Sequence, residues 1–413
     1  SINKVNEEYY KGIKRIEPGT INKIDKDFNL NTLRYWNPKY VIDNKISYQD
    51  AVSNVKEILI NAVKIRMRSD VPIAFCMSGG IDSNSLISIA KNELGYGVHG
   101  FTIVNTDKRY EEYELIKESV DYLDIKHTEL YLDKTNFLEN LTEQIASHDS
   151  PISTISYYLH WQLMKKINDY GFKVTISGTG ADEIFTGYYD HHNLYLNEVF
   201  NDKEIFDEAL NNWQKYLSPI VRNPFLKDPF LYIKDKNIRD HIFLNNKFFS
   251  ETLKKPWLEE FKETNFTESL LRNRMLNELF EEAIPVILKE DDMNAMYYSI
   301  ENRSPFLDSK LFEYAYTIPS KFLIKDGKAK SILRSAMEGI ASQKILDNRR
   351  KVGFNAPLDD LLDLKNKETY ELILDQSEIY NYVKKDEIEK LINLEKMPNS
   401  ISKFLFNFLN IKI

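Results

Sequence analysis

The chain has 413 residues, carries 63 acidic residues against 55 Lys and Arg for a formal charge of −8, and is 42% hydrophobic. This balance is typical of a globular protein long enough for a substantial core. The acidic excess argues against a dedicated nucleic-acid binder, which needs clustered Lys and Arg. The single cysteine, Cys76, excludes an intrachain disulfide and a cysteine-rich metal site, and it fits a reducing compartment such as the cytoplasm. No apolar run approaches the ~18 residues of a membrane span.

Glycine is scarce, with 14 residues in the chain, about half of the usual ~7%. Five of these glycines fall in two short clusters, Gly79-Gly80 and Gly178/Gly180/Gly187. A chain that uses glycine so sparingly makes these clusters the first candidates for a functional site.

Alternating strands and helices dominate the first half of the chain. Residues 1–40 predict one or two small strands and an exit loop, and residues 47–68 predict a helix behind the N-cap Ser47. The apolar run Val71–Met77 predicts a strand buried on both faces. Further strands are predicted over 98–104, 128–132 and 173–176, and helices over 85–93, 110–122, 135–148 and 154–170. This alternation predicts an α/β fold with a doubly wound parallel sheet, and from about residue 195 onward we expect extensive additional α-helices.

The first glycine cluster, Ser78-Gly-Gly-Ile-Asp-Ser83, stands between a predicted strand and a predicted helix. Glycines let backbone N–H groups approach a ligand closely, and the helix start adds its positive dipole, so the pattern favours a phosphate site. Ser78 and Ser83 add hydroxyl donors, while Asp82 would repel phosphate unless Mg²⁺ lay between them. The loop lacks the lysine of a nucleoside-triphosphatase P-loop. An ordinary strand-to-helix turn with capping serines is the alternative.

The second glycine cluster also follows a predicted strand and also ends in an acid, Asp182. Ligands of doubly wound sheets bind beyond the carboxyl ends of the strands. Both loops are therefore expected to open onto one crevice, where Asp82 and Asp182 share the metal.

Five motifs carry a resemblance to a known family. Ser78–Ser83 resembles the pyrophosphate loop (PP-loop) of the N-type ATP pyrophosphatases, and Ser177–Tyr189 resembles the S-G-E-G-A-D-E motif of the asparagine synthetase family. Glu301–Asp308 resembles that family's E-x-R-x-P-F-L-D, Gly327–Arg334 its G-x-x-K-x-x-L-R, and Arg350–Pro357 its K-x-G-F-x-x-P. The resemblance implies an adenine-nucleotide α-hydrolase-like (PP-loop) fold.

It also implies a reaction in which ATP is split at its α-phosphorus, a carboxylate becomes an acyl-adenylate, and ammonia attacks it. Matching the motifs residue by residue assigns the following roles: Ser78, Gly79, Gly80 and Ser83 to pyrophosphate, Asp82 and Asp182 to Mg²⁺, Ser177 and Gly178 to the nucleotide, Lys351 to the transition state at phosphorus, and Glu301, Arg303 and Thr179 to the acyl side.

Some of these residues have structural alternatives. Arg303 is also explained by an ion pair with Glu301 that fixes the loop. A solvated helix face is an even alternative for Lys330 and Arg334, and His191 and His192 are surface or supporting residues more readily than metal ligands.

Two departures from the family pattern bear on the acceptor. The glutamate of S-G-E-G is Thr179 here, and threonine cannot be a general base at neutral pH. The basic residue of the family's D-[RK]-x-x-M stretch is also missing, since residues 290–293 read Glu-Asp-Asp-Met. Both departures disfavour aspartate as the acceptor.

Residues 1–40 resemble the tail of a glutaminase domain and its linker, so we interpret them as a stub and residues 41–413 as the ATP-pyrophosphatase domain. Within that domain we expect a nucleotide-binding core over about 41–195 and a helical remainder over 196–413. With no N-terminal cysteine nucleophile, ammonia would come from a missing domain or a glutaminase subunit. A homodimer also stays open.

Four functions remain to be compared: amidation of aspartate as the default, amidation of a hexuronic acid for a surface polysaccharide, intramolecular amide closure as in β-lactam or lasso-peptide cyclases, and a tRNA-modifying PP-loop enzyme. The last is disfavoured by the acidic charge and by the placement of Cys76 in a predicted buried strand. Intact Asp82, Asp182 and Lys351 argue against a non-catalytic scaffold.

Overall fold

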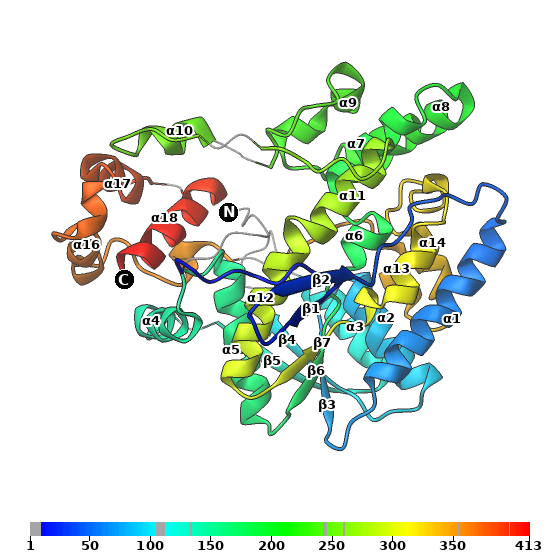
Figure 1. Cartoon of the computed structure of the whole chain (residues 1–413), viewed down its shortest axis with the longest axis horizontal. Coiled ribbons are helices and arrows are strands. Elements are labelled where there is room, and N and C mark those ends of the chain that lie inside the picture. The colour runs from blue at the N-terminus through cyan, green and yellow to red at the C-terminus, as the bar shows by residue number, and fades with distance from the viewer. Residues whose placement is uncertain are drawn as a thin grey trace.

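A computed structural model describes residues 10–104, 112–132, 134–242, 246–258, 261–353, 356–395 and 397–413. A five-stranded parallel sheet in the order β5-β4-β3-β6-β7 forms its centre (Figure 1). The strands are β3 (Ile73–Cys76), β4 (His99–Val104), β5 (Lys126–Tyr131), β6 (Val174–Ile176) and β7 (Glu301–Arg303). The predicted doubly wound parallel sheet is therefore confirmed.

Helices cover both faces of this sheet. The predicted helices of the first half are present as α1 (Tyr48–Arg66), α2 (Ile81–Ser88), α3 (Tyr113–Leu123), α4 (Phe137–His148) and α5 (Ile155–Asp169). Ile73 and Phe75 of β3 belong to one apolar core with α1, whereas Ala74 belongs to another with α5 and α12. This alternation along β3 follows from the strand period of two, and it is why the whole strand sequence is apolar.

The second half of the chain adds mainly helices. They are α6 (Ala181–Phe185), α7 (Tyr189–Glu198), α8 (Lys203–Asn212), α9 (Leu231–Lys234), α10 (Asn246–Glu251), α11 (Leu270–Phe280), α12 (Ala283–Tyr297), α13 (Ser309–Ala315), α14 (Ser331–Ala336), α15 (Gln343–Asp347), α16 (Lys367–Leu374), α17 (Lys385–Ile392) and α18 (Asn399–Lys412). Short 3-10 helices lie at Pro224–Lys227, Pro305–Leu307, Ser320–Phe322, Leu358–Asp360 and Glu378–Asn381, and π-helical turns at Ile89–Glu93 and Trp213–Leu217. The edge strand β7 also comes from this half, so the sheet extends beyond the nucleotide-binding core expected over 41–195.

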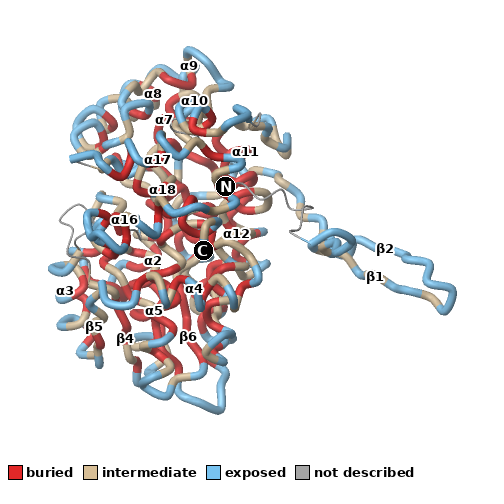
Figure 2. Tube along the Cα trace, turned by 90° about the vertical axis from the view of Figure 1, so that its left-hand side faces the viewer, coloured by how far each residue is buried: buried red, intermediate tan, exposed pale blue. Residues whose placement is uncertain are grey.

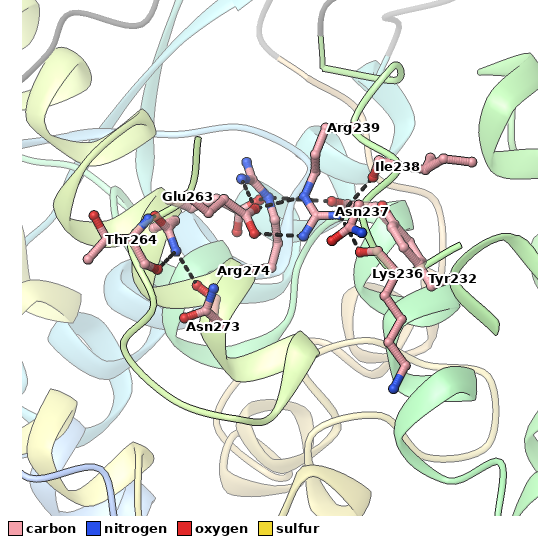
Figure 3. A network of polar contacts seen from close by, with 12 residues as sticks. Tyr232, Lys236, Asn237, Ile238, Arg239, Glu263, Thr264, Asn273 and Arg274 are labelled. Carbon is pink, nitrogen blue, oxygen red and sulfur yellow. Dashed lines mark hydrogen bonds and ion pairs between the residues drawn. The ribbon is translucent and has the colours of Figure 1, made fainter. Parts of the chain in front are cut away.

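A buried ion network fixes the segment that connects α9 with α11 (Figure 3). The Arg239 guanidinium donates two hydrogen bonds to Glu263, with N–O distances of 2.8 and 2.6 Å. Arg274 of α11 donates to the same carboxylate at 2.8 Å and to Glu282 at 2.6 and 2.8 Å. Such a network of charge-assisted hydrogen bonds gives this segment a defined place on α11.

The N-terminal region is a two-stranded hairpin of β1 (Thr20–Ile24) and β2 (Leu30–Arg34), which projects from the rest of the molecule (Figure 2). Its apolar side chains are exposed, with Phe28 at its tip 88% exposed. The interpretation of residues 1–40 as the stub of another domain stays a prediction. Across the described part of the chain, the helices are too short or too polar for any of them to span a bilayer.

Candidate active site

The loop Ser78–Gly80 is pre-shaped by its own side chains. Ser83 of α2 accepts a hydrogen bond from the Ser78 backbone N–H at 3.1 Å. The Asn84 amide donates to the carbonyl oxygens of Ser78 and Gly80, at 2.9 and 2.6 Å. Asn84 is 1% exposed and was not among the predicted site residues, because nothing in its spacing distinguishes it from a core position. Its amide holds two loop carbonyls away from the space that a phosphate would need.

The two glycine loops lie against one another, as expected from the parallel sheet. A Cβ atom placed on Gly178 would lie 3.0 Å from the Cβ atom of Asp82 and 3.0 Å from the backbone nitrogen of Ser83. The loop after β6 therefore reaches the start of α2 only because residue 178 has no side chain.

Two carboxylates and two lysines meet where the loops touch. The Lys330 Nζ atom lies 2.6 Å from Asp82 Oδ1 and 2.5 Å from Asp182 Oδ1. The Lys351 Nζ atom lies 2.5 Å from Asp182 Oδ2 and 4.0 Å from Asp82 Oδ2. Burial by itself would raise the pKa of Asp182, but the two lysine charges outweigh it and hold that pKa well below its usual range. The Asp182 carboxylate is therefore ionised at neutral pH.

Gly187 makes room for this cluster. A Cβ atom at this position would fall 1.6 Å from Asp182 Oδ1 and 2.6 Å from the Cε atom of Lys330. The third glycine of the second cluster is thus required by the ion pair itself.

The alternative of a solvated helix face is wrong for Lys330 and Arg334. Lys330 is 3% exposed, with a φ of +56° that lets it turn toward the aspartates before α14 begins. Burial lowers the pKa of Arg334 to about 10, and its guanidinium donates to the carbonyls of Ala329 and Leu346 at 2.8 and 2.7 Å.

Two cavities flank the cluster and share part of their walls. The larger, of about 300 Å³, has a mixed lining that includes Thr102, Ile103, Leu159, His160, Thr179 and Gly353. The smaller, of about 70 Å³, is lined by basic side chains, Lys330, Arg334, Arg349, Arg350 and Lys351. Ser78, Asp82, Glu112 and Lys351 line both. A space with apolar walls beside a basic one suits a nucleotide whose phosphates point toward the lysines.

A family model described as asparagine synthase matches residues 54–407, which is most of the chain. The chain belongs to the asparagine synthase family. It is 27% identical to asparagine synthetase [glutamine-hydrolyzing] 1 of Bacillus subtilis over 94% of this chain and 63% of that protein. It is 28% identical to asparagine synthetase [glutamine-hydrolyzing] 3 of the same organism over 83% of this chain and 54% of that protein. It is also 22% identical to Amidase chyE of Penicillium rubens over 83% of this chain and 58% of that protein. The chain thus spans less than two thirds of the length of these relatives.

The E-x-R motif of the asparagine synthase family lies at the edge of the sheet here. Arg303 pairs with Glu301 at 2.9 Å and donates to the backbone oxygens of Arg66 and Arg68 at 2.6 and 2.8 Å. Neither Glu301 nor Arg303 is among the residues that line the two cavities. These contacts support the structural alternative, in which the pair joins β7 to the end of α1.

Thr179, which replaces the family glutamate, contacts the acidic stretch on α12. Its hydroxyl lies 3.3 Å from Ser177 Oγ, and hydrogen bonding to it lowers the pKa of the Asp291 carboxyl. Asp291 Oδ1 lies 3.5 Å from Nδ1 of His160. Glu290 accepts from the Ser153 backbone N–H at 3.1 Å and lies 3.5 Å from His148. Two acids of the stretch that looked out of place in the sequence, Glu290 and Asp291, are thus buried beside the departure at residue 179, whereas Asp292 is exposed.

The two histidines after the second glycine cluster are buried, so a surface position is wrong for both. His191 groups with Asp190 and Glu278, but Arg274 lies 3.8 and 3.1 Å from these carboxylates and makes the group part of the ion network. Burial lowers the pKa of His192 to about 3, which keeps it neutral beside the basic cavity.

The donor set of Asp82 and Asp182 fits a divalent cation. Because the Lys330 nitrogen contacts oxygens of both carboxylates, these oxygens converge on one point. Carboxylate oxygens are also the protein ligands that Mg²⁺ prefers. Lys330 and Lys351 already offset the negative charge of Asp82. The repulsion between Asp82 and a phosphate group is therefore not by itself a reason to expect a metal ion. Of the last motif, Phe354 and Asn355 lie outside the described residues.

Proposed function

We propose that this chain is an ATP-dependent ligase that converts a carboxylate to an amide and releases AMP and pyrophosphate. The observation that carries the proposal is the meeting of Asp82, Asp182, Lys330 and Lys351 between a basic cavity and a larger mixed one. Family membership supports the same reading.

In this reaction the pyrophosphate part of ATP lies in the basic cavity. Backbone N–H groups of Gly79 and Gly80 and the hydroxyls of Ser78 and Ser83 donate to it, while Ser177 and Gly178 border the nucleotide. Asp82 and Asp182 would hold Mg²⁺, which supplies positive charge to the phosphates. Lys351 lines both cavities, so its ammonium group is suited to the charge that develops at the α-phosphorus when the carboxylate attacks.

The acceptor is aspartate by default, because the named relatives with the highest identity are asparagine synthetases. A hexuronic acid is the second candidate. Its hydroxyl groups can form hydrogen bonds with the hydroxyl of Thr179, which lines the cavity, whereas the second carboxylate of aspartate would approach the buried acid Asp291 behind it. Ammonia would come from a glutaminase domain or subunit, as the relatives' glutamine-hydrolysing names suggest for them.

Thiol chemistry of a tRNA-modifying kind is disfavoured. Burial raises the pKa of the Cys76 thiol to about 12, so this side chain is neutral and a poor nucleophile at neutral pH.

Pyrophosphate release tests the proposal. The protein is given ATP, Mg²⁺ and ammonium with L-aspartate, D-glucuronate, D-galacturonate or no acid. Release that depends on one acid and forms its amide with AMP supports the proposal and names the acceptor. Acid-dependent formation of ADP and orthophosphate would contradict it.

A further inference from the structure

We propose that Thr179, Asp291 and His160 form a proton relay that takes the proton from the attacking nitrogen, with Thr179 as its cavity-facing member and Asp291 and His160 as its acceptor. This inference rests on the proposed amide-forming reaction. It gives that reaction the base that residue 179 alone cannot supply.

The contacts form a continuous path away from the cavity. Thr179 and His160 both line the larger cavity, together with Lys351. Hydrogen bonding to Thr179 lowers the pKa of Asp291, which places the Thr179 hydroxyl beside this carboxylate as well as 3.3 Å from Ser177 Oγ. Asp291 Oδ1 lies 3.5 Å from His160 Nδ1. Asp291 and His160 are 8% and 9% exposed, so these contacts are largely shielded from bulk solvent.

His160 has a feature that a purely structural side chain would not need. Its Nε2 atom is buried without a hydrogen-bond partner among the described residues, although the side chain borders the cavity. Its Nδ1 atom lies near Asp291 and 3.3 Å from the Asn294 amide nitrogen. A buried imidazole nitrogen without a partner is costly unless a ligand or a proton uses it.

The proton balance is simple. When ammonia attacks the acyl-adenylate, the C–N bond forms and the nitrogen becomes positively charged. One N–H bond breaks and its proton passes to Thr179 Oγ1, while the hydroxyl's own proton passes to Asp291. The carbon–oxygen bond to AMP then breaks, and AMP leaves with the electron pair. The Asp291–His160 pair thus takes up one proton for each amide formed.

The surroundings favour a pair that can take up a proton. Burial raises the pKa of the Asp291 carboxyl, and Glu290 on the same helix adds to this effect, while His160 and Thr179 oppose it. Tyr157 of α5 and Cys76 of β3 also interact with Asp291, but the pKa of each is raised, so both stay neutral at neutral pH. Farther away, His148 of α4 faces Glu290 rather than Asp291.

The test separates adenylation from amide formation. The 413-residue chain and the variants Asp291→Asn, Thr179→Val and His160→Gln are assayed with each of the three acids for ATP–pyrophosphate exchange. They are then assayed for amide formation at constant free ammonia, and for hydroxamate formation with hydroxylamine, which loses its proton more readily. The matched control is Asp292→Asn, which removes the neighbouring, exposed carboxylate of the same stretch.

We expect Asp291→Asn and Thr179→Val to lower amide formation about 10²-fold or more, with exchange and hydroxamate formation changed far less. We expect amide formation by the wild type to decline toward low pH as Asp291 becomes protonated, and the residual rate of Asp291→Asn to lack this decline. The double variant Thr179→Glu/Asp291→Asn, which restores a carboxylate at residue 179, should regain amide formation. Asp292→Asn should match the wild type.

Equal losses in exchange and amide formation, or an unchanged amide rate in Asp291→Asn, would overturn the relay. If no acid supports exchange in the wild type, the proposed function fails instead. The relay is then judged on the free protein by the carboxyl resonance of Asp291. Thr179→Val and His160→Gln should each raise the pKa of Asp291, and an unchanged value would contradict the contacts.

Discussion

At the residue scale, the two lysines of the cluster differ in what surrounds them. The Lys330 side chain is 4% exposed and contacts both carboxylates, whereas the Lys351 side chain is 32% exposed and borders both cavities. Lys330 therefore holds the two glycine loops together, and Lys351 is the more accessible of the two lysines to a ligand.

These differences predict that removing Lys351 costs activity, whereas removing Lys330 costs stability. Lys351→Ala should lower ATP–pyrophosphate exchange by about 10²-fold or more with little change in thermal unfolding. Lys330→Met should instead destabilise the fold by about 3–5 kcal/mol, because two buried carboxylates lose a shared partner. Calorimetry and the exchange assay separate the two effects. The control is Lys344→Ala, which removes an exposed lysine paired with Glu118 and should change neither the exchange rate nor the stability. Full exchange activity in Lys351→Ala would show that Lys351 has no catalytic role.

Glu112 predicts a pH dependence of stability. Burial raises the pKa of this carboxyl from an ordinary 4.5 to about 7, against the opposing effect of Lys351. Between these values the unfolded chain loses the proton before the folded one, so the free energy of unfolding falls as pH rises and levels off above pH 7. Glu112→Gln removes this decline. Its stability should equal that of the wild type near pH 4 and exceed it by about 2–3 kcal/mol at pH 8.

Urea unfolding at both pH values measures this difference. A variant that gains nothing at pH 8, or gains as much at pH 4, would show that Glu112 is not held protonated by the fold.

At the scale of elements, the site is made by the contact between the loop after β3 and the loop after β6. Gly178→Ala would push a methyl group against Asp82 and Ser83, and the loops would have to separate. We expect a loss of ATP binding of 10-fold or more with a stability cost of about 1–3 kcal/mol. Gly97→Ala is the matched control, since a Cβ atom there has open space around it. Isothermal titration with ATP and Mg²⁺ measures both, and equal binding in the two variants would contradict the close contact.

The strands and helices of the first half could be predicted from the sequence because their patterns are strong. The run from Val71 to Met77 is apolar without interruption, and the fold buries β3 on both faces. The strand β7 (Glu301–Arg303) could not be predicted in the same way, because it is short, its residues are polar, and it joins the sheet only through β6.

The candidate site could be predicted where its residues are neighbours in the sequence, as in the two glycine loops. It was not predictable where a partner lies far along the chain. Lys330 is separated from Asp82 by 248 residues, so nothing local distinguishes it from a solvated lysine. Asp291 meets His160 because α12 packs beside α5, and the acidic stretch therefore looked misplaced in the sequence.

At the scale of the whole molecule, the buried ion network of Arg274 joins the 236–264 segment to α7 and α11 (Figure 3). Arg274→Met would leave several carboxylates buried without their partner. We expect a loss of about 3–5 kcal/mol in the free energy of unfolding. The control is Arg34→Met on the projecting hairpin, whose exposed pair with Glu17 contributes at most about 1 kcal/mol. Thermal unfolding of both variants tests this, and similar shifts would contradict a structural role for the network.

The account of the whole molecule depends on one intermediate, the acyl-adenylate, and oxygen transfer reports it most directly. The acid that supports pyrophosphate release is labelled with ¹⁸O in its carboxylate and incubated with the protein, ATP, Mg²⁺ and ammonia. Because the carboxylate oxygen attacks the α-phosphorus and leaves with it, one ¹⁸O atom should appear in AMP for each amide formed. Label in orthophosphate formed with ADP, or unlabelled AMP beside labelled amide, would contradict the account.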